Sequence, residues 1–206
     1  VSMRLEANQI SFRYGRYLPW IFQKLDFAVE SDERVGIFAP SGHGKTTLAM
    51  ALSGYNLPTS GSVLLDGKPL PKQGICPVQL IYQHPEQAID PRWRLKRVLE
   101  ESGALQENVL NAFGIQLDWL DRFPRELSGG ELQRFCAARA LMSGAKFLIC
   151  DEISTMLDVI TQAQLWELIL TEAEKQSMGL VVITHNLKLA KRVCTRIFDL
   201  PKCAFL

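Results

Sequence analysis

The stretch "IFAPSGHGKTTLAMALSG", residues 37–54, decides the fold of this chain. It starts in an apolar run, turns at two closely spaced glycines and continues into good helix formers. Gly44, Lys45 and Thr46 match the end of the phosphate-binding pattern G-x-x-x-x-G-K-[ST], whereas Ala39 stands where that pattern begins with glycine. A strand, a tight turn and a helix in this order predict an α/β fold with a phosphate-binding loop.

The residues of this loop predict how a nucleotide is held. Because glycine accepts positive φ, Gly42 and Gly44 let backbone N–H groups approach phosphate oxygens closely. We expect Lys45 to reach the β and γ phosphates and Thr46 to hold Mg²⁺. The other contacts with the nucleotide are predicted at Ser41, His43 and Thr47.

Two loop residues raise questions of their own. Ala39 ends the strand and begins the turn, so we expect it to be accepted provided that its φ is negative. His43 is a candidate for metal binding or acid–base chemistry, but its place in the loop contributes backbone groups.

The pattern outside the loop predicts a mostly parallel sheet covered on both faces, preceded by an antiparallel β patch. Residues 4–12 and 20–29 alternate apolar and polar side chains as half-buried strands do. Further strands are predicted at 35–38, 63–65, 78–82, 147–150, 180–184 and around Ile197, and helices at 46–52, 131–142, 162–174 and 187–193.

The middle of the chain predicts a helical subdomain. Residues 94–120 show amphipathic helical periodicity that Gly103 and Gly114 interrupt. We interpret the segment from about 84 to 143 as a helical insertion into one domain of residues 1–206, a length that suits a single buried core.

Composition excludes several classes of protein. A net charge of +1 gives no electrostatic reason to expect a nucleic-acid partner. No run approaches the roughly 20 apolar residues of a membrane span, and the first residues lack the apolar core of a signal peptide. The five cysteines are scattered without a C-x-x-C pair, which argues against a zinc site and fits a reducing cytosol.

A second chemical element is "FLICDE", residues 147–152, an apolar strand that ends on two carboxylates. We expect Asp151 to bind Mg²⁺ through water and Glu152 to polarise a water for attack on the γ phosphate. Acidic residues often occur at strand ends without any catalytic role. The position of this pair relative to the loop is therefore what supports its assignment to the site.

A third element is "LSGGE", residues 127–131. Ser128 is a good helix N-cap, and Gly129 and Gly130 expose the backbone N–H groups that follow it. Ser128 to Glu131 therefore predict a second anion site at a helix N-terminus, or else an ordinary capped helix.

Together these motifs resemble the nucleotide-binding subunit of ATP-binding cassette (ABC) transporters, whose domain is a P-loop NTPase fold of ABC type. The resemblance covers nearly the whole chain in the family's order. It comprises the loop, Gln83 after "VQLIY", "LSGGE", "FLICDE", "STMLD" at 154–158 and "ITHN" around His185.

The resemblance implies further site residues. Tyr14 resembles the aromatic residue that stacks on adenine, with Tyr17 as the runner-up. Gln83 resembles the glutamine that contacts Mg²⁺ and the lytic water, and His185 resembles the switch histidine at the γ phosphate. Asp158 resembles the aspartate that crosses the interface between two cassettes.

The resemblance also explains why one chain carries two phosphate-binding devices. In this family Ser128, Gly129, Gly130 and the neighbouring Glu131 face ATP held by the opposite subunit of a head-to-tail dimer, formed by two identical or two different cassettes. ATP and Mg²⁺ are the implied cofactors. The chain departs from the family at Ala39, Glu131, Ile153, Met156 and Asn186, and we still expect a hydrolysis-competent site.

A narrower resemblance connects "YQHPEQAIDPRWRLKRVLEE" and "LDVITQAQLWELI" with the peptide and nickel importer branch of the family. It implies an importer of peptides, nickel or a metal chelate, held at the cytoplasmic face of the membrane by transmembrane permease subunits. Two alternatives are a non-transport ABC ATPase that clamps DNA or ribosomes and a degenerate cassette that binds ATP without cleaving it.

Overall fold

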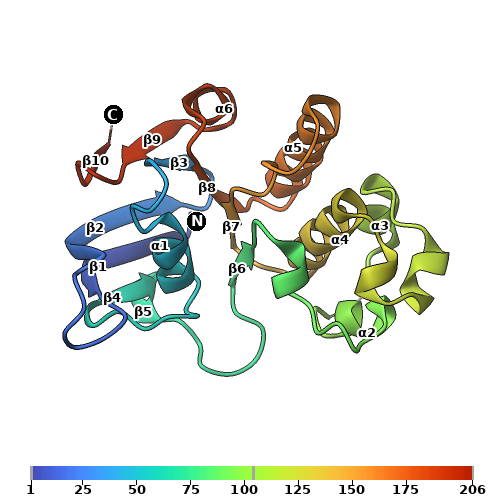
Figure 1. Ribbon diagram of the computed structural model, residues 1–206, viewed down its shortest axis with the longest axis horizontal. Coiled ribbons are helices and arrows are strands. Elements are labelled where there is room, and N and C mark those ends of the chain that lie inside the picture. Colours follow the sequence, from blue (N-terminus) through green and yellow to red (C-terminus); the bar gives the residue numbers. More distant parts are fainter. Residues whose placement is uncertain (1, 104, 206) are drawn as a thin grey trace.

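The computed structural model describes residues 2–103 and 105–205 and has an α/β architecture built on two sheets (Figure 1). Residues 1 and 206 of the predicted domain, and residue 104 of the predicted insertion, lie outside the described residues. The larger sheet has the order β10-β9-β3-β8-β7-β6, and the smaller has the order β2-β1-β4-β5. The strands are β1 (Arg4–Phe12), β2 (Phe22–Glu30), β3 (Arg34–Phe38), β4 (Ser60–Leu65), β5 (Lys68–Pro69), β6 (Val78–Ile81), β7 (Phe147–Asp151), β8 (Gly179–Thr184), β9 (Arg196–Asp199) and β10 (Ala204–Phe205).

The predicted strand directions are confirmed. In the larger sheet β6, β7, β8, β3 and β9 pair in parallel, and only β10 runs antiparallel to its neighbour β9. The smaller sheet is antiparallel throughout its described pairs. The two-residue strands β5 and β10 are not predicted from the sequence, because they are too short to show a period.

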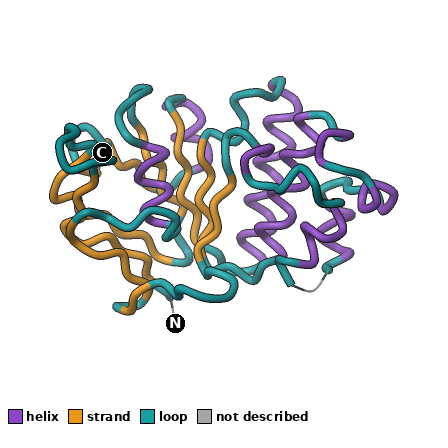
Figure 2. The backbone as a smooth tube through the Cα atoms, turned by 60° about the horizontal axis from the view of Figure 1, so that its bottom comes forward, coloured by secondary structure: helices purple, strands orange, loops and turns teal. Residues whose placement is uncertain are grey.

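Most helices gather at one end of the molecule, as Figure 2 shows, whereas α1 lies beside the antiparallel sheet (Figure 1). Those from η1 to α4 all lie in the chain between β6 and β7. The periodic segment 94–120 is broken into α2, α3 and η2. The helices are α1 (Lys45–Leu52), η1 (Pro85–Gln87), α2 (Leu95–Glu100), α3 (Glu107–Ala112), η2 (Leu117–Asp121), η3 (Pro124–Glu126), α4 (Gly129–Met142), α5 (Val159–Lys175) and α6 (Leu187–Val193).

The central strands are buried on both faces, which explains their continuous apolar sequences. All five residues of β7 and all six of β8 are buried. On one face Leu148 and Cys150 join a core cluster that includes residues of α4, α5 and α6. On the other face Phe147 and Ile149 join a cluster formed with α1 and the antiparallel sheet. The parallel sheet is therefore the layer on which both halves of the core are built.

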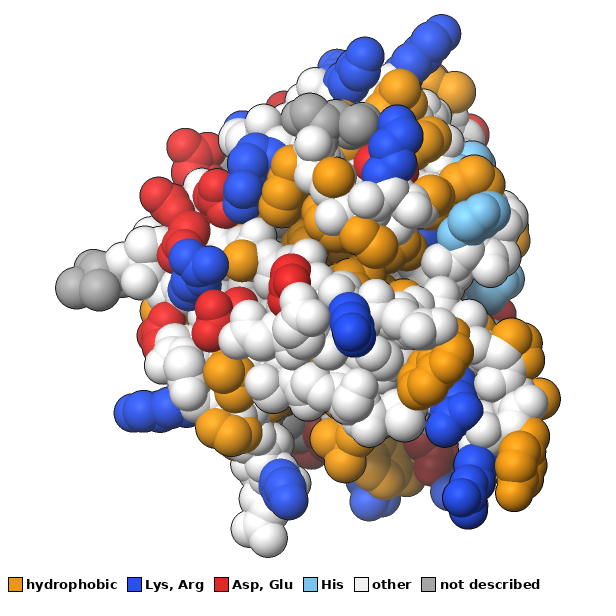
Figure 3. Space-filling model, turned by 90° about the vertical axis from the view of Figure 1, so that its left-hand side faces the viewer, with side chains coloured by type: hydrophobic (Ala, Val, Ile, Leu, Met, Phe, Trp, Pro, Cys, Tyr) orange, Lys and Arg blue, Asp and Glu red, His pale blue; other side chains and the backbone are white. Residues whose placement is uncertain are grey.

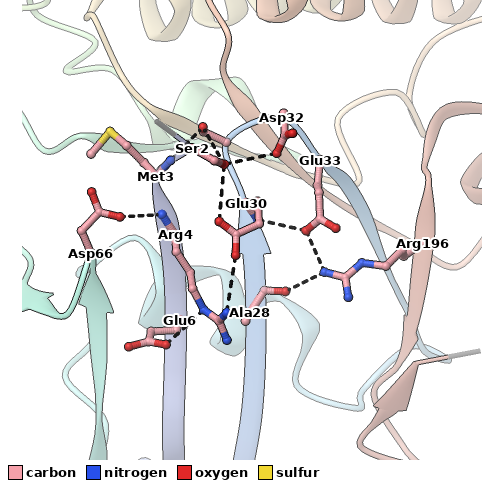
Figure 4. A network of polar contacts seen from close by, with 11 residues as sticks. Ser2, Met3, Arg4, Glu6, Ala28, Glu30, Asp32, Glu33, Asp66 and Arg196 are labelled. Atoms are coloured by element: carbon pink, nitrogen blue, oxygen red, sulfur yellow. Dashed lines mark hydrogen bonds and ion pairs between the residues drawn. The ribbon is translucent and has the colours of Figure 1, made fainter.

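A polar network ties the antiparallel sheet to β9 (Figure 4). The guanidinium of Arg196 donates to the carbonyl of Ala28 at 3.2 Å and pairs with Glu33 at 2.7 Å. Glu33 in turn accepts the backbone N–H of Glu30 at 3.0 Å. These contacts connect the end of β2, the turn before β3 and the start of β9.

The outer face on the side of the antiparallel sheet carries a mixed surface (Figure 3). Basic side chains are spread over this face, and acidic ones lie among them. The mixture agrees with the net charge of +1.

Candidate functional site

Four parallel strands bring the predicted site residues to one edge of the larger sheet. Because β3, β8, β7 and β6 are neighbours that run in parallel, their carboxyl ends lie side by side. β3 leads into the glycine-containing loop, and β7 ends on Asp151. His185 follows the last residue of β8, and Gln83 lies just beyond β6. Residues far apart in the sequence thus meet at the edge where open α/β sheets bind ligands.

The loop has the backbone that its glycines predict. Gly42 and Gly44 have φ of 81° and 80°, and Gly44 is the N-cap of α1. Ala39 is buried and is not among the described residues with positive φ, so the backbone condition for an alanine at this position is met. A methyl group on Gly44 would lie 2.3 Å from Cγ2 of Ile21, so a close approach also requires glycine there. The loop can therefore turn its N–H groups toward an anion.

Lys45 is buried behind this loop, with 6% of its side chain exposed. Its Nζ donates to the carbonyl oxygens of Ala39 at 3.0 Å and Pro40 at 3.1 Å. It also lies 3.2 Å from Oε1 of Glu152. Three oxygen atoms thus hold the ammonium group in this buried position.

Asp151 and Thr46 form an oxygen pair suited to a hard cation. The carboxylate of Asp151 is buried and accepts a hydrogen bond from Thr46. The pKa of Asp151 is raised, chiefly by burial and also by the charge of Glu152, although the hydrogen bond from Thr46 and the charge of Lys45 oppose this shift. A Mg²⁺ ion would offset the cost of burying this carboxylate, and its preferred ligands are oxygen atoms of this kind. The residues present therefore fit the implied metal.

Glu152 lies between Lys45 and His185. While Oε1 faces Lys45, Oε2 lies 3.1 Å from Nδ1 of His185, whose side chain is about half exposed. The backbone of Glu152 has φ of 48°, an uncommon conformation for a residue with a side chain. A crevice of about 340 Å³ opens beside Glu152 and His185.

Gln83 is connected to Glu152 by Thr155, a residue that the sequence analysis does not single out. Its Nε2 donates to Oγ1 of Thr155 at 3.2 Å, and Thr155 Oγ1 donates to the carbonyl of Glu152 at 3.0 Å. Thr155 lies within the motif "STMLD", from which only Asp158 was predicted as a site residue. A hydroxyl shortly after the carboxylate pair is the only sequence signal that could have suggested it.

Tyr14 is hydrogen-bonded to Thr47, whereas Tyr17 makes no hydrogen bond to the loop among the described residues. The hydroxyl of Tyr14 is 2.9 Å from Oγ1 of Thr47, and 63% of Tyr14 is exposed. Tyr17 is 92% exposed, with the guanidinium of Arg16 over its ring. An exposed ring tied to the loop is free to stack on a base, which favours Tyr14 over its runner-up. His43 is exposed, and its Nδ1 lies 3.2 Å from the carbonyl of Ser41.

Ser128 and Glu131 form a reciprocal cap at the start of α4. Ser128 N–H donates to Glu131 Oε2 at 2.7 Å, and Glu131 N–H donates to Ser128 Oγ at 3.3 Å. Gly129 and Gly130 form the first turn, so α4 begins two residues before the predicted start. Among the described residues, no hydrogen bond or ion pair joins this turn to the loop at 39–47. One chain therefore presents two separate N–H-rich helix starts.

Asp158 caps α5 within its own chain. Its Oδ1 accepts the backbone N–H groups of Ile160 at 3.0 Å and Thr161 at 3.1 Å. This cap extends the helix to Val159, three residues before the predicted start at 162. The pKa of Asp158 is lowered, chiefly by the side-chain hydrogen bond from Thr161.

Comparison with known families decides the class of this protein. The model of the family described as ABC transporter matches residues 22–155. The chain belongs to the ABC transporter family. The nickel import system ATP-binding protein NikE of Staphylococcus aureus (strain bovine RF122 / ET3-1) is 31% identical over 210 residues, which cover 95% of this chain and 86% of that protein. The nickel import ATP-binding protein NikE of Rhodospirillum rubrum is 30% identical over 201 residues, covering 88% and 73%.

Solved ABC structures support the same fold. The ATP-binding cassette MJ0796, in a dimeric post-hydrolysis state bound to ADP and Pi, superposes with a TM-score of 0.79 at 21% identity, covering 95% of this chain and 93% of that one. The cassette cbiO1 of Clostridium perfringens, part of the ABC transporter complex cbiONQ, gives 0.77 at 21% identity, covering 95% and 83%.

This ABC chain is an ATP-binding subunit. The family match includes the loop, Ser128 and Glu152, whereas Tyr14, Asp158 and His185 lie outside it, and the roles of individual site residues stay predictions. Within the described part of the chain, every helix is too short or too polar to cross a bilayer.

Proposed function

We propose that this ABC subunit hydrolyses ATP at the sheet edge formed by β3, β7 and β8 and so drives import across a membrane. The observation that carries the proposal is the contact chain Lys45–Glu152–His185. In it a cation at the start of α1, a carboxylate just after β7 and an imidazole just after β8 are joined by contacts of 3.2 and 3.1 Å. A phosphoryl-transfer site needs this combination of charge stabilisation and a base.

Each group has a distinct role in the proposed reaction. The N–H groups of the loop surround the phosphates, and Lys45 turns from Glu152 to the β and γ phosphate oxygens. Glu152, once released from Lys45, orients and polarises the attacking water. His185 contacts the other oxygen of Glu152, and we assign it the contact with the γ phosphate.

Further residues would bind the metal ion and the adenine ring of ATP. Thr46, Gln83 and Asp151 would hold Mg²⁺, Asp151 through water. When bound, Mg²⁺ neutralises charge on the β and γ phosphate oxygens. Tyr14 provides the surface for adenine, because its exposed ring is anchored to Thr47 beside the loop.

A second cassette, identical or different, completes the site in a head-to-tail dimer. α4 starts at Gly129 and Gly130, whose N–H groups take no part in the reciprocal cap of Ser128 and Glu131 and belong to a turn with no described hydrogen bond to the loop of their own chain. We therefore assign this turn to ATP bound by the opposite subunit, and Asp158 to the interface between the subunits. ATP at the interface then favours closure, and hydrolysis removes the charge that holds the halves together.

The proposed cargo is nickel, a metal chelate or a peptide. This assignment is supported by relatives of 30–31% identity that are named nickel import proteins and that match most of the chain. Transport requires transmembrane permease subunits as partners, which would hold the chain at the cytoplasmic face of the membrane. Nucleic acid is not a proposed partner.

Replacing the base tests the reaction. Glu152→Gln keeps the shape of the side chain and removes its basicity, so phosphate release should fall by about 10²- to 10⁴-fold while ATP binding persists. Glu174→Gln, an exposed glutamate on α5, is the matched control and should hydrolyse ATP like the unmodified chain. Unchanged turnover of Glu152→Gln would contradict the assigned base.

The transport role needs a separate experiment. A tagged chain expressed in the organism that encodes it should co-purify with integral membrane proteins. Deletion of its gene should lower the uptake of radioactive nickel. Recovery of ribosomes or DNA in place of membrane proteins would contradict the proposal. Normal nickel uptake with lost peptide uptake would assign the cargo to peptides.

A further inference from the structure

Thr155 connects two parts of the site that are far apart in the sequence. Its Oγ1 donates to the carbonyl of Glu152 at 3.0 Å and accepts Nε2 of Gln83 at 3.2 Å. Its backbone N–H donates to the same carbonyl at 3.2 Å. The hydroxyl of Thr155 therefore donates its single proton to the carbonyl of Glu152 and accepts the N–H of Gln83 with a lone pair, as the hydrogen-bonding capacity of threonine allows.

The carbonyl that Thr155 holds belongs to the residue with the most unusual backbone in the site. Glu152 has φ of 48°, a region that residues with side chains seldom adopt. Its N–H donates to the carbonyl of Ile183 on β8 at 3.0 Å, so the peptide groups on both sides are fixed. Because rotation about this backbone would swing the carboxylate, the contacts of Thr155 help to set where Glu152 points.

The rest of the turn is anchored to α5. Ser154 is buried and accepts Nε2 of Gln162 at 2.7 Å and Nε1 of Trp166 at 3.1 Å. The neighbouring side chain, Thr155, is exposed and points instead to Gln83, which lies outside the strands and is only partly buried. Gln83 is therefore a partner of this turn that comes from a loop, whereas Gln162 and Trp166 come from a helix.

We propose that Thr155 is a positioning residue that transmits the position of Gln83 to the backbone of Glu152. A displacement of Gln83 removes the bond to Thr155 Oγ1, which frees the hydroxyl and loosens its hold on the carbonyl of Glu152. Serine can make both bonds, whereas valine, which has the same shape as threonine, can make neither. The effect on turnover rests on the proposed ATP hydrolysis, but the link between the two residues does not.

Kinetics test the consequence for the reaction. Thr155→Val should lower kcat about tenfold with KM for ATP unchanged, because the carboxylate of Glu152 is then displaced from its reactive position while the nucleotide contacts remain. Thr155→Ser should restore kcat. Thr171→Val, an exposed threonine of α5, is the matched control and should behave like the unmodified chain. If Thr155→Val unfolds, Thr155→Ala provides the same comparison, with far-ultraviolet circular dichroism as the check on folding.

A double-mutant comparison separates transmission from a merely local turn. If Thr155 carries the effect of Gln83, the pair Gln83→Ala and Thr155→Val should reduce kcat no further than the more damaging single change. Effects that multiply would overturn the proposal, because the two residues would then act independently.

Nuclear magnetic resonance of the ¹⁵N-labelled chain tests the link without any turnover. Gln83→Ala should shift the backbone amide peak of Glu152 in the chain that keeps Thr155, and should leave that peak in place in the Thr155→Val variant. Equal shifts in both backgrounds, or none in either, would overturn the link. If the unmodified chain releases no phosphate, the proposed function fails, and these shifts still decide whether Thr155 connects the two residues.

Discussion

Nζ of Lys45 lies 3.2 Å from Oε1 of Glu152, and both side chains are largely shielded from water, with 6% and 12% exposed. The pair joins the loop after β3 to the end of β7. Two opposite charges in such a place stabilise each other, and removal of one leaves the other desolvated without its partner. The same contact that prepares the proposed site therefore also contributes to the fold.

Lys45→Met should weaken both ATP binding and folding. Loss of the charge-assisted contacts to phosphate should lower ATP affinity by about 10- to 100-fold. The free energy of unfolding should fall by about 2 kcal/mol, because the largely buried carboxylate of Glu152 loses the ammonium group that faces it. Urea unfolding at pH 7 without nucleotide, together with a nucleotide titration, measures both quantities.

The double variant Lys45→Met, Glu152→Gln supplies the control for that experiment. It removes both charges, so most of the lost unfolding free energy should return while ATP affinity stays low. A double variant as unstable as Lys45→Met would show that the destabilisation does not come from the unpaired carboxylate.

Gly44 and Ala39, two small residues of the loop, should differ in how their exchange affects nucleotide affinity. Gly44→Ala places a methyl group 2.3 Å from Ile21 Cγ2 at a φ of 80°, so nucleotide affinity should fall at least about tenfold. Ala39→Gly restores the glycine of the phosphate-loop pattern at a position whose φ is not positive. It should leave nucleotide affinity unchanged and reduce the unfolding free energy by about 1 kcal/mol. Equal losses of affinity would contradict this account, as calorimetric nucleotide titration can show.

The fold could be predicted because its central strands are long apolar runs and its loop carries glycines at required positions. β7 and β8 are such runs, and their carboxyl ends had to meet once the sheet was parallel. Helix starts were less predictable. α4 and α5 begin earlier than their apolar periodicity suggests, because the side chains of Ser128 and Asp158 cap them.

The links within the site could not be predicted from spacing. Strand ends place Gln83 and Glu152 near each other, but the exact register of a turn decides that Thr155 lies between them. The same holds for Ser154, whose two donors come from one face of α5. Contacts of this kind depend on side-chain packing, for which a single sequence carries no periodic signal.

Glu131 should make the stability of α4 depend on pH. Its pKa is lowered, chiefly by the backbone hydrogen bond from Ser128, relative to the ordinary value of 4.5. A carboxyl whose folded pKa is depressed stabilises the fold fully above its unfolded pKa and loses that contribution as pH falls through the folded pKa. Glu131→Gln should therefore destabilise the chain at pH 7 and make little difference below the lowered pKa.

Ser128→Ala provides a comparison for the same helix start. It removes a neutral cap, so the unfolding free energy should fall by about 1 kcal/mol with little dependence on pH. Urea unfolding of both variants from pH 3 to pH 7 distinguishes the charged half of the cap from the neutral half. A constant difference between Glu131→Gln and the unmodified chain over this range would rule out the carboxylate contribution.

Ser154 should stabilise the junction between β7 and α5 through its two buried hydrogen bonds. Ser154→Ala leaves the indole N–H of Trp166, a side chain that is 4% exposed, without its acceptor. An unsatisfied buried donor costs about 1–3 kcal/mol, so the unfolding free energy should fall by that amount, as urea unfolding can measure. Ser60→Ala, an exposed serine of β4, is the matched control and should change it little. Adding Trp166→Phe to Ser154→Ala removes the stranded donor as well, so the two losses should be less than additive, and strict additivity would show that the bond contributes nothing.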